Sequence, residues 1–152
     1  MYVKVVEILK NFFEHVLKEF EIKQKDIYQI HPLVLAYIGD SVYEVFIRTL
    51  VACEGNATVN MLHRRSTGFV KAKAQSDGVH RIMNSLSAEE QDIVRRGRNA
   101  KSGTIPKNAD VTEYKYATGF ESLIGYLYLK KDFERLIEVM KMSVEDCESH
   151  NH

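Results

Sequence analysis

Residues 33–48 form an almost wholly apolar segment that carries two acidic side chains near its middle. Asp40 and Glu44 lie four positions apart, so a helix places both carboxylates on one face, about one turn from each other. Burying an ionised carboxylate without a partner is costly, so we expect positive charge to lie opposite this face. The segment therefore predicts a core helix with an unusual acidic position, and the rest of the chain must explain it.

A second strongly apolar helix repeats this pattern with Glu121. Two core helices that each bury an acid can neutralise both by sharing a cation. Oxygen ligands with no Cys or His beside them favour Mg²⁺ or Mn²⁺ over Zn²⁺. Mg²⁺ on carboxylates commonly bridges to phosphate oxygens, activates a water and stabilises the leaving oxygen. Gly39 permits close approach to Asp40, and Gly119 and Gly125 permit the same around Glu121.

A structural interpretation of these acids stays open at this point. Asp40 and Glu121 can instead accept hydrogen bonds at helix ends or pair with an arginine. Glu44 has weaker support as a ligand, because Arg48 follows it by four residues and can form a salt bridge along the helix surface.

Length and composition indicate one globular domain in a reducing compartment. The chain has 152 residues, of which 45% are hydrophobic and 28% charged, which is enough for a proper core. Lys plus Arg equal Asp plus Glu at 21 each, so net charge indicates no polyanionic partner. Two cysteines without metal-ligand spacing favour a reduced cytoplasmic protein. Charges run through residues 1–20, so we expect no signal peptide, and no apolar run is long enough for a membrane span.

Apolar residues recur at spacings of three and four along most of the chain, and convincing strand alternation is absent. This periodicity predicts an all-α fold of about seven helices. Helix starts are predicted at Pro32, at Thr58, at Ser87 with Glu90 in a capping box, and at Asp110 with Glu113. The predicted helices span residues 3–20, 33–52, 59–75, 77–84, 88–96, 111–129 and 133–148.

Residues 95–107 hold five basic side chains, two glycines, one proline and no acid, which predicts a flexible basic loop. Its amides and cations suit phosphate binding, and the basic face of residues 63–73 can extend the track. A-form RNA is recognised mainly through its shape, backbone and 2′-hydroxyls, so no aromatic platform is required. A solvated surface is the alternative interpretation of these short basic runs. The candidate RNA-binding residues are His63, Arg64, Lys71, Lys73, Arg95, Arg96, Arg98, Lys101 and Lys107.

Two acidic motifs resemble those of the ribonuclease III family. Residues 37–42 (Tyr-Ile-Gly-Asp-Ser-Val) resemble its signature helix, and residues 117–126 (Ala-Thr-Gly-Phe-Glu-Ser-Leu-Ile-Gly-Tyr) resemble its second acidic motif. The short branch called Mini-ribonuclease III is more similar still. The segments typical of that branch are 35–40, 69–75, 95–103, 106–110 and 120–125. These motifs span about residues 31–130, and the first twenty or so residues look like an extension.

The resemblance implies an all-α, Mg²⁺-dependent endonuclease domain that acts as a homodimer on double-stranded RNA, with one catalytic centre per subunit. The short branch lacks a separate RNA-binding domain and is associated with maturation of the 23S ribosomal RNA precursor. Carried over residue by residue, the family motif makes Asp40 and Glu121 the catalytic metal ligands. The expected organisation is an N-terminal helix and linker over residues 1–26, a catalytic domain over 27–148 and a disordered tail over 149–152.

Two departures from the larger family affect the expected metal count. That family has a Glu four residues before the Asp, where this chain has Ala36, and an Asp three residues before the second Glu, where it has Thr118. The short branch shares both gaps. A fixed two-metal cage is therefore less expected, unless Glu44, water or RNA phosphates supply further ligands.

Two other function classes compete with the endonuclease interpretation. A non-catalytic RNA-binding protein of the ribosome can share the fold, but a binder has no need to keep acids in apolar helices. A helical di-metal redox protein would need Glu-x-x-His pairs, which the sequence lacks.

Overall fold

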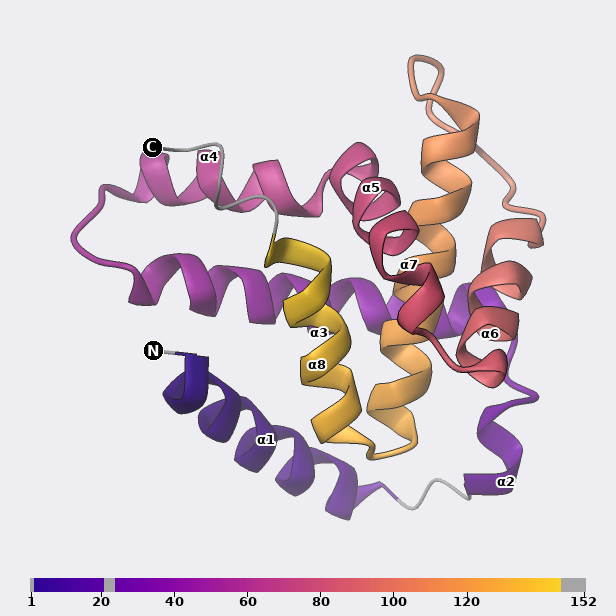
Figure 1. Cartoon of the computed structure of the whole chain (residues 1–152), viewed down its shortest axis with the longest axis horizontal. Coiled ribbons are helices and arrows are strands. Elements are labelled where there is room, and N and C mark those ends of the chain that lie inside the picture. The colour runs from indigo at the N-terminus through magenta and orange to yellow at the C-terminus, as the bar shows by residue number, and fades with distance from the viewer. Residues whose placement is uncertain (1, 21–23, 146–152) are drawn as a thin grey trace.

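A computed structural model describes residues 2–20 and 24–145 of the chain (Figure 1). All regular structure in these residues is helical, which confirms the prediction of an all-α fold. In this part of the chain, no helix combines the length and apolarity needed to cross a membrane. The helices are α1 (Tyr2–Glu19), α2 (Gln24–Ile27), α3 (Pro32–Cys53), α4 (Val59–Val70), α5 (Ala72–Ile82), η1 (Met83–Ser85, 3-10), α6 (Ala88–Asn99), α7 (Val111–Leu129) and α8 (Phe133–Val144).

The two helices that carry Asp40 and Glu121, α3 and α7, cross at the centre of the molecule (Figure 1). Leu35 and Phe46 of α3 and Leu123 and Ile124 of α7 are fully buried at this core. Helices α5 and α6 pack on α7, and α4 packs on α3. Burial on several sides explains why α3 and α7 are apolar around most of their circumference rather than along one stripe.

Two glycines allow α3 and α7 to pack with their backbones almost in contact. A Cβ atom on Gly39 would lie 1.8 Å from the Glu121 carbonyl oxygen, and one on Gly125 would lie 2.0 Å from the Leu35 carbonyl oxygen. Any larger residue would force the helices apart. This confirms the predicted close approach at Gly39 and Gly125, and it brings the backbones of the two acidic positions together.

The predicted helix starts are confirmed by the capping contacts. Pro32 lies in the first turn of α3, and Thr58 Oγ1 accepts a hydrogen bond from the Met61 amide at 3.3 Å. Ser87 and Glu90 form the predicted reciprocal capping box at the start of α6. Asp110 Oδ1 accepts from the Glu113 amide at 3.0 Å at the start of α7. Side-chain caps of this kind satisfy amides that the first turn of a helix leaves free.

Several predicted boundaries are wrong. The helix predicted over 59–75 is broken at Lys71, whose extended backbone ends α4 and begins α5. The short segment predicted over 77–84 belongs to α5 and η1. The helix predicted to end near Arg96 continues to Asn99, and the linker predicted at the end of residues 1–26 includes the start of α2.

Helix α1 packs against its own chain. Leu9, Phe13 and Leu17 are buried, and the Phe13 ring centroid lies 5.0 Å from that of Tyr128 and 6.2 Å from that of Phe133. The predicted tail over 149–152 and the end of the helix predicted to reach 148 lie outside the described residues. The proposed division at residue 26 stays a prediction.

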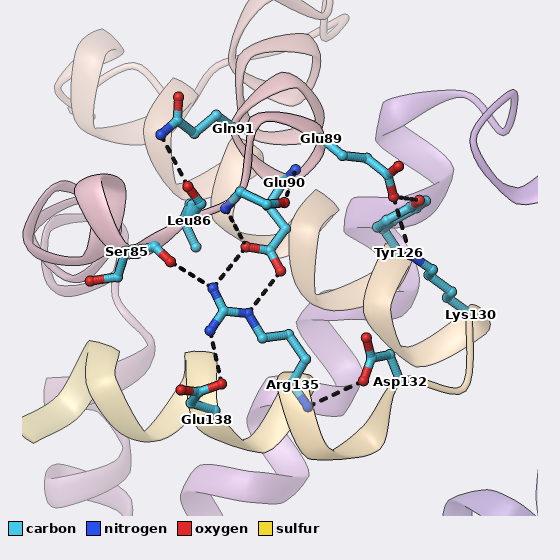
Figure 2. A network of polar contacts seen from close by, with 11 residues as sticks. Ser85, Leu86, Glu89, Glu90, Gln91, Tyr126, Lys130, Asp132, Arg135 and Glu138 are labelled. Atoms are coloured by element: carbon cyan, nitrogen blue, oxygen red, sulfur yellow. Dashed lines mark hydrogen bonds and ion pairs between the residues drawn. The ribbon is translucent and has the colours of Figure 1, made fainter.

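A polar network ties the start of α6 to α7 and α8 (Figure 2). Arg135 of α8 donates two hydrogen bonds to the buried Glu90 carboxylate, at 2.8 and 2.9 Å, and a third to the Ser85 carbonyl at 2.7 Å. Beside it, Glu89 accepts hydrogen bonds from Tyr126 and Lys130. The two-pronged Arg–carboxylate geometry is among the stronger polar contacts in proteins, so this network fixes the relative positions of three helices.

Candidate active site

Asp40 and Glu121 lie beside each other where α3 crosses α7. Gly39, which precedes Asp40, packs directly on the Glu121 backbone, and the charge of Asp40 acts on the Glu121 carboxyl. Residues 81 positions apart in sequence are thus brought together by the close crossing of the two helices. The structure therefore pairs the two acids that the sequence singles out, but Asp40 is exposed and Glu121 half-buried, so the prediction that both acids are buried is wrong for Asp40.

Both carboxyls have raised pKa values. Burial, and secondarily the charge of Asp40, raises the pKa of Glu121 to about 8. Burial, and secondarily the charge of Glu44, raises the pKa of Asp40 above its usual range. A low-dielectric environment disfavours the charged form, and a neighbouring like charge adds to the effect. Perturbed carboxyls of this kind are a common property of functional sites.

No side-chain cation neutralises this pair within residues 2–20 and 24–145. No lysine or arginine forms an ion pair with Asp40 or Glu121, and no positive group lowers the pKa of either carboxyl. The positive charge expected opposite the acidic face is therefore not supplied by a side chain of this part of the chain. The structural alternative, an acid held by an arginine, does not describe either residue.

Glu44 has the salt bridge that the sequence predicted. Its Oε1 atom accepts a hydrogen bond from Arg48 Nε at 2.7 Å, one turn along α3. Glu44 still contributes to the raised pKa of Asp40. It therefore borders the acidic pair, while its own charge is balanced by Arg48.

The donor atoms at this site fit a hard divalent cation better than a soft one. Two carboxyls with no cationic partner supply oxygen ligands, and because their pKa values are raised, a bound cation would favour their charged, ligating form. Over the described ranges, no group of three His, Cys, Asp or Glu side chains is arranged to hold a metal ion. Asp40 and Glu121 would thus supply two ligands, and water or substrate oxygens would complete the shell, as is common for Mg²⁺.

Gln75 of α5 is a polar residue at this site that the sequence did not reveal. Its side-chain amide is buried, and it acts favourably on the Glu121 carboxyl, lowering a pKa that burial raises. Among the described residues, neither its nitrogen nor its oxygen has a hydrogen bond of normal geometry. The segment 69–75 ends in this glutamine, but nothing in the local pattern indicates that it reaches Glu121.

The predicted flexible basic loop is wrong in its first part, because residues 95–99 complete α6. Arg96 lies over the Tyr28 ring, 4.8 Å from its centroid, and donates to the Tyr28 carbonyl oxygen at 2.7 Å. Arg98 donates to the Tyr116 hydroxyl at 3.0 Å and lies over that ring. Both guanidinium groups therefore also hold the helix in place, and neither is a freely moving loop side chain.

The other predicted RNA-binding residues are exposed to solvent. Arg95 pairs with Asp92 one turn earlier on α6, and Lys73 pairs with Asp77 at 2.9 Å on α5. The remaining exposed cations lie on α4, at the α4–α5 break and in the segment after α6: His63, Arg64, Lys71, Lys101 and Lys107. These surfaces contribute charge, but the structure does not assign them a ligand.

A cavity of about 280 Å³ lies between the start of α3 and the end of α6. Its lining includes His31, Arg95, Arg96 and Asn99. Two guanidinium groups and a carboxamide suit the recognition of anionic oxygens. This cavity gives two of the predicted RNA-binding residues a shared surface.

Comparison with known proteins decides the family. Residues 33–132 match the Ribonuclease III domain model, which spans both acidic helices and the segment between them. The chain belongs to the ribonuclease III family. The prediction that it is an endoribonuclease of this class is thereby confirmed.

Curated relatives place the chain in the Mini-ribonuclease 3 group of this family. It is 51% identical over 133 residues to Mini-ribonuclease 3 of Thermoanaerobacter sp. (strain X514), covering 87% of this chain and 94% of that protein. It is 46% identical over 123 residues to Mini-ribonuclease 3 of Enterococcus faecalis, covering 80% and 93%. A crystal structure of a Fusobacterium nucleatum protein superposes with a TM-score of 0.71 at 32% identity, over 80% of this chain and 97% of that one.

Proposed function

We propose that this ribonuclease III family member cleaves double-stranded RNA in a Mg²⁺-dependent reaction, with Mn²⁺ as an alternative ion, at Asp40 and Glu121. The observation that carries the proposal is the adjacent pair of carboxyls, with Asp40 exposed and Glu121 half-buried, that has no side-chain cation in the described part of the chain. Leaving such charges unbalanced is unfavourable, so a site selected only for stability would not retain them. A bound divalent ion and a phosphodiester substrate account for both acids.

The residues of the chain have separate tasks in this mechanism. Asp40 lies on the more exposed side of the pair, so its carboxylate is suited to orient water towards a phosphodiester. Glu121 is held more deeply by α7 and fixes the other side of the ion site. When bound, Mg²⁺ supplies a Lewis acid that lowers the pKa of water and balances the charge developing on phosphate oxygens. The close crossing at Gly39 and Gly125 holds the two carboxyls at a fixed position relative to each other.

Substrate binding is proposed to rest on the catalytic domain itself. Arg95 and Arg96 line the cavity beside the start of α3, and Lys101 and Lys107 are exposed in the segment that follows α6. Phosphate contacts by such cations release counterions, so affinity should fall steeply as salt rises. A-form RNA offers its backbone and 2′-hydroxyls for this kind of shape-based recognition.

A second copy of the chain is the proposed partner, and the exposed apolar face of α3 supports this. Tyr37 is 79% exposed, and Val34 and Val45 are also exposed although each belongs to the central helix. Tyr37 follows Val34 by three positions and precedes Val45 by eight, so the three side chains lie along one side of α3, next to the acidic pair. Covering this surface with its own copy in a two-fold dimer would bury it and place two active sites near one interface.

The proposed cellular role is maturation of the ends of the 23S ribosomal RNA precursor in the cytoplasm. Its support is the similarity to the Mini-ribonuclease 3 group. The test is incubation of the purified protein with a structured precursor of this RNA, with either Mg²⁺ or chelator. Cleavage at defined positions only with Mg²⁺ is expected, whereas binding without cleavage would favour the non-catalytic alternative.

RNA binding by the exposed lysines after α6 is tested separately, with an exposed lysine far from this segment as the control. Lys101→Ala with Lys107→Ala should weaken RNA affinity and reduce the slope of log affinity against log salt by about 2, one for each lost phosphate contact. Lys18→Ala, an exposed cation on α1, is the matched control and should leave the slope unchanged. An unaltered slope in the double variant would exclude these lysines from the RNA surface.

A further inference from the structure

Gln75 is the most unusual buried polar residue in the described chain. Only 2% of it is exposed, and within the described residues neither its side-chain nitrogen nor its side-chain oxygen makes a hydrogen bond of normal geometry. An unsatisfied buried amide costs free energy, so a position under selection for stability alone would favour an apolar side chain. The retained amide therefore points to a role beyond packing.

The location of Gln75 indicates what that role is. Helix α5 packs on α7, and the buried Gln75 side chain lies beside the Glu121 carboxyl, where its amide can donate to a carboxylate. Across residues 2–20 and 24–145, Gln75 is thus the only side chain found to support the charge of Glu121.

The backbone around Gln75 is well anchored, so its amide is held in a defined place. The backbone N–H of Gln75 donates to the Lys71 carbonyl oxygen at 3.1 Å, next to the break between α4 and α5. One turn further on, a Cβ atom on Gly78 would lie 3.1 Å from the Ser143 carbonyl oxygen of α8. Close packing on both sides leaves α5 little freedom to move away from α7.

We propose that Gln75 is the positioning residue of Glu121: its Nε2–H group donates to the Glu121 carboxylate when a divalent cation occupies the site. The inference rests on the proposed ion-binding function of Asp40 and Glu121. Side chains that hydrogen-bond a metal-binding carboxylate orient it, and replacing them typically costs about 10- to 100-fold in metal affinity or activity. The unsatisfied amide is then a preorganised donor whose partner is complete only in the ion-bound protein.

Gln75→Met is the decisive variant, because it keeps the side-chain length and removes the amide. Mn²⁺ is the probe, measured by calorimetry and by electron paramagnetic resonance of free Mn²⁺, without RNA. The dissociation constant for Mn²⁺ should rise about tenfold or more, while the melting temperature of the chelated protein should stay the same or rise. A residue that only fills space would shift neither quantity in this opposed way.

Two further variants separate the explanations. Gln91→Leu is the matched control: its Nε2 donates to the Met83 and Leu86 carbonyl oxygens, so the melting temperature should fall while Mn²⁺ affinity is unchanged. Gln75→Glu keeps the shape but replaces the donor by an acceptor. It should lower the melting temperature of the chelated protein and the single-turnover cleavage rate at saturating Mn²⁺.

Failure of the proposed function and failure of the Gln75 proposal give different results. Wild-type protein that does not bind Mn²⁺ would overturn the proposed function itself. Normal Mn²⁺ binding by both wild type and Gln75→Met would overturn the role of Gln75 alone. A Gln75→Met protein that is unfolded or much less stable would also contradict the proposal, because removing an unsatisfied buried amide should not destabilise the chelated fold. A wild-type cleavage rate in Gln75→Glu would exclude the donor role.

Discussion

Glu90 and Glu121 are both acids at packed helix interfaces, yet their surroundings are opposite. Glu90 receives two hydrogen bonds from Arg135 and one from the Ser87 amide, and these contacts hold the pKa of Glu90 below its usual range. Glu121 has no cationic partner in the described chain, and burial with Asp40 nearby raises its pKa to about 8. The Glu90 carboxylate has a cationic partner and hydrogen-bond donors within the protein, whereas the Glu121 carboxylate has no cationic partner in the described chain.

This difference separates a structural acid from a candidate functional one. The Glu90 network joins α6 to α8 and resembles other paired, fully hydrogen-bonded buried charges (Figure 2). The Glu121 region keeps an acidic pair and an unsatisfied amide at the crossing of the two central helices. Unbalanced groups in a packed core indicate that an external partner completes them.

The largest expected effect comes from breaking the ion pair between Glu90 and Arg135. Arg135→Leu leaves the Glu90 carboxylate buried and unpaired, which should lower the free energy of unfolding by about 4 kcal/mol. Glu138→Gln removes only an exposed partner of Arg135 and is the control, with a loss below about 1 kcal/mol. Chemical denaturation measures both. A loss below about 1 kcal/mol in Arg135→Leu would show that the network contributes little.

The next largest effect is the pH dependence of the free energy of unfolding that Glu121 causes, measured in the presence of chelator. Because the folded pKa of Glu121 lies above its unfolded value, its contribution is present below about pH 4.5 and is lost as pH rises towards 8. Wild type should therefore lose on the order of 3 kcal/mol between pH 5 and 8 relative to Glu121→Gln. Adding Mn²⁺ to wild type at pH 8 should restore stability. Parallel pH profiles for the two proteins would contradict the raised pKa.

A smaller effect is expected from separating the two acidic helices. Gly39→Ala places a methyl group against the Glu121 backbone and should cost about 2 kcal/mol, with reduced cleavage. Gly68→Ala on α4 meets no atom within 4 Å and is the matched control, expected to change stability by less than about 1 kcal/mol. Unfolding and cleavage assays compare the two. Equal behaviour would mean that α3 and α7 tolerate a wider spacing.

The smallest effect is expected at Glu44, which borders the acidic pair but has its own partner. Glu44→Gln removes an exposed i,i+4 salt bridge with Arg48 and should change the free energy of unfolding by less than about 0.5 kcal/mol. Mn²⁺ affinity should fall less than in Asp40→Asn. A loss as large as that of Asp40→Asn would make Glu44 a metal ligand and revise the count of protein carboxylates.

Local signals predicted most of the fold, because helix periodicity and capping residues act over a few positions. The starts at Thr58, Ser87 and Asp110 follow from side-chain oxygens that cap exposed amides. The break at Lys71 was missed, since neither it nor its neighbours are helix breakers and tertiary packing directs α5. The end of α6 was misplaced because Gly97 suggested a loop, whereas it permits packing against Ser122 of α7.

The acidic pair was predictable and its surroundings were not. Asp40 and Glu121 stand out because an acid inside an apolar helix is rare, and this holds without any knowledge of the fold. Gln75 is a common polar residue near a helix start, and its significance depends on a contact across 46 positions of sequence. The tyrosines that hold Arg96 and Arg98 are likewise visible only once the helices are packed.

The most direct test of the acidic pair is single-turnover cleavage of a double-stranded RNA by Asp40→Asn and Glu121→Gln, with RNA affinity measured in parallel. A metal ion contributes several kcal/mol to phosphoryl transfer, so each variant should cut roughly a thousandfold more slowly in Mg²⁺ or worse. RNA affinity should remain near the wild-type value, because neither acid binds phosphate alone. Cleavage by Asp40→Asn at the wild-type rate would contradict the assignment of this pair as the catalytic centre.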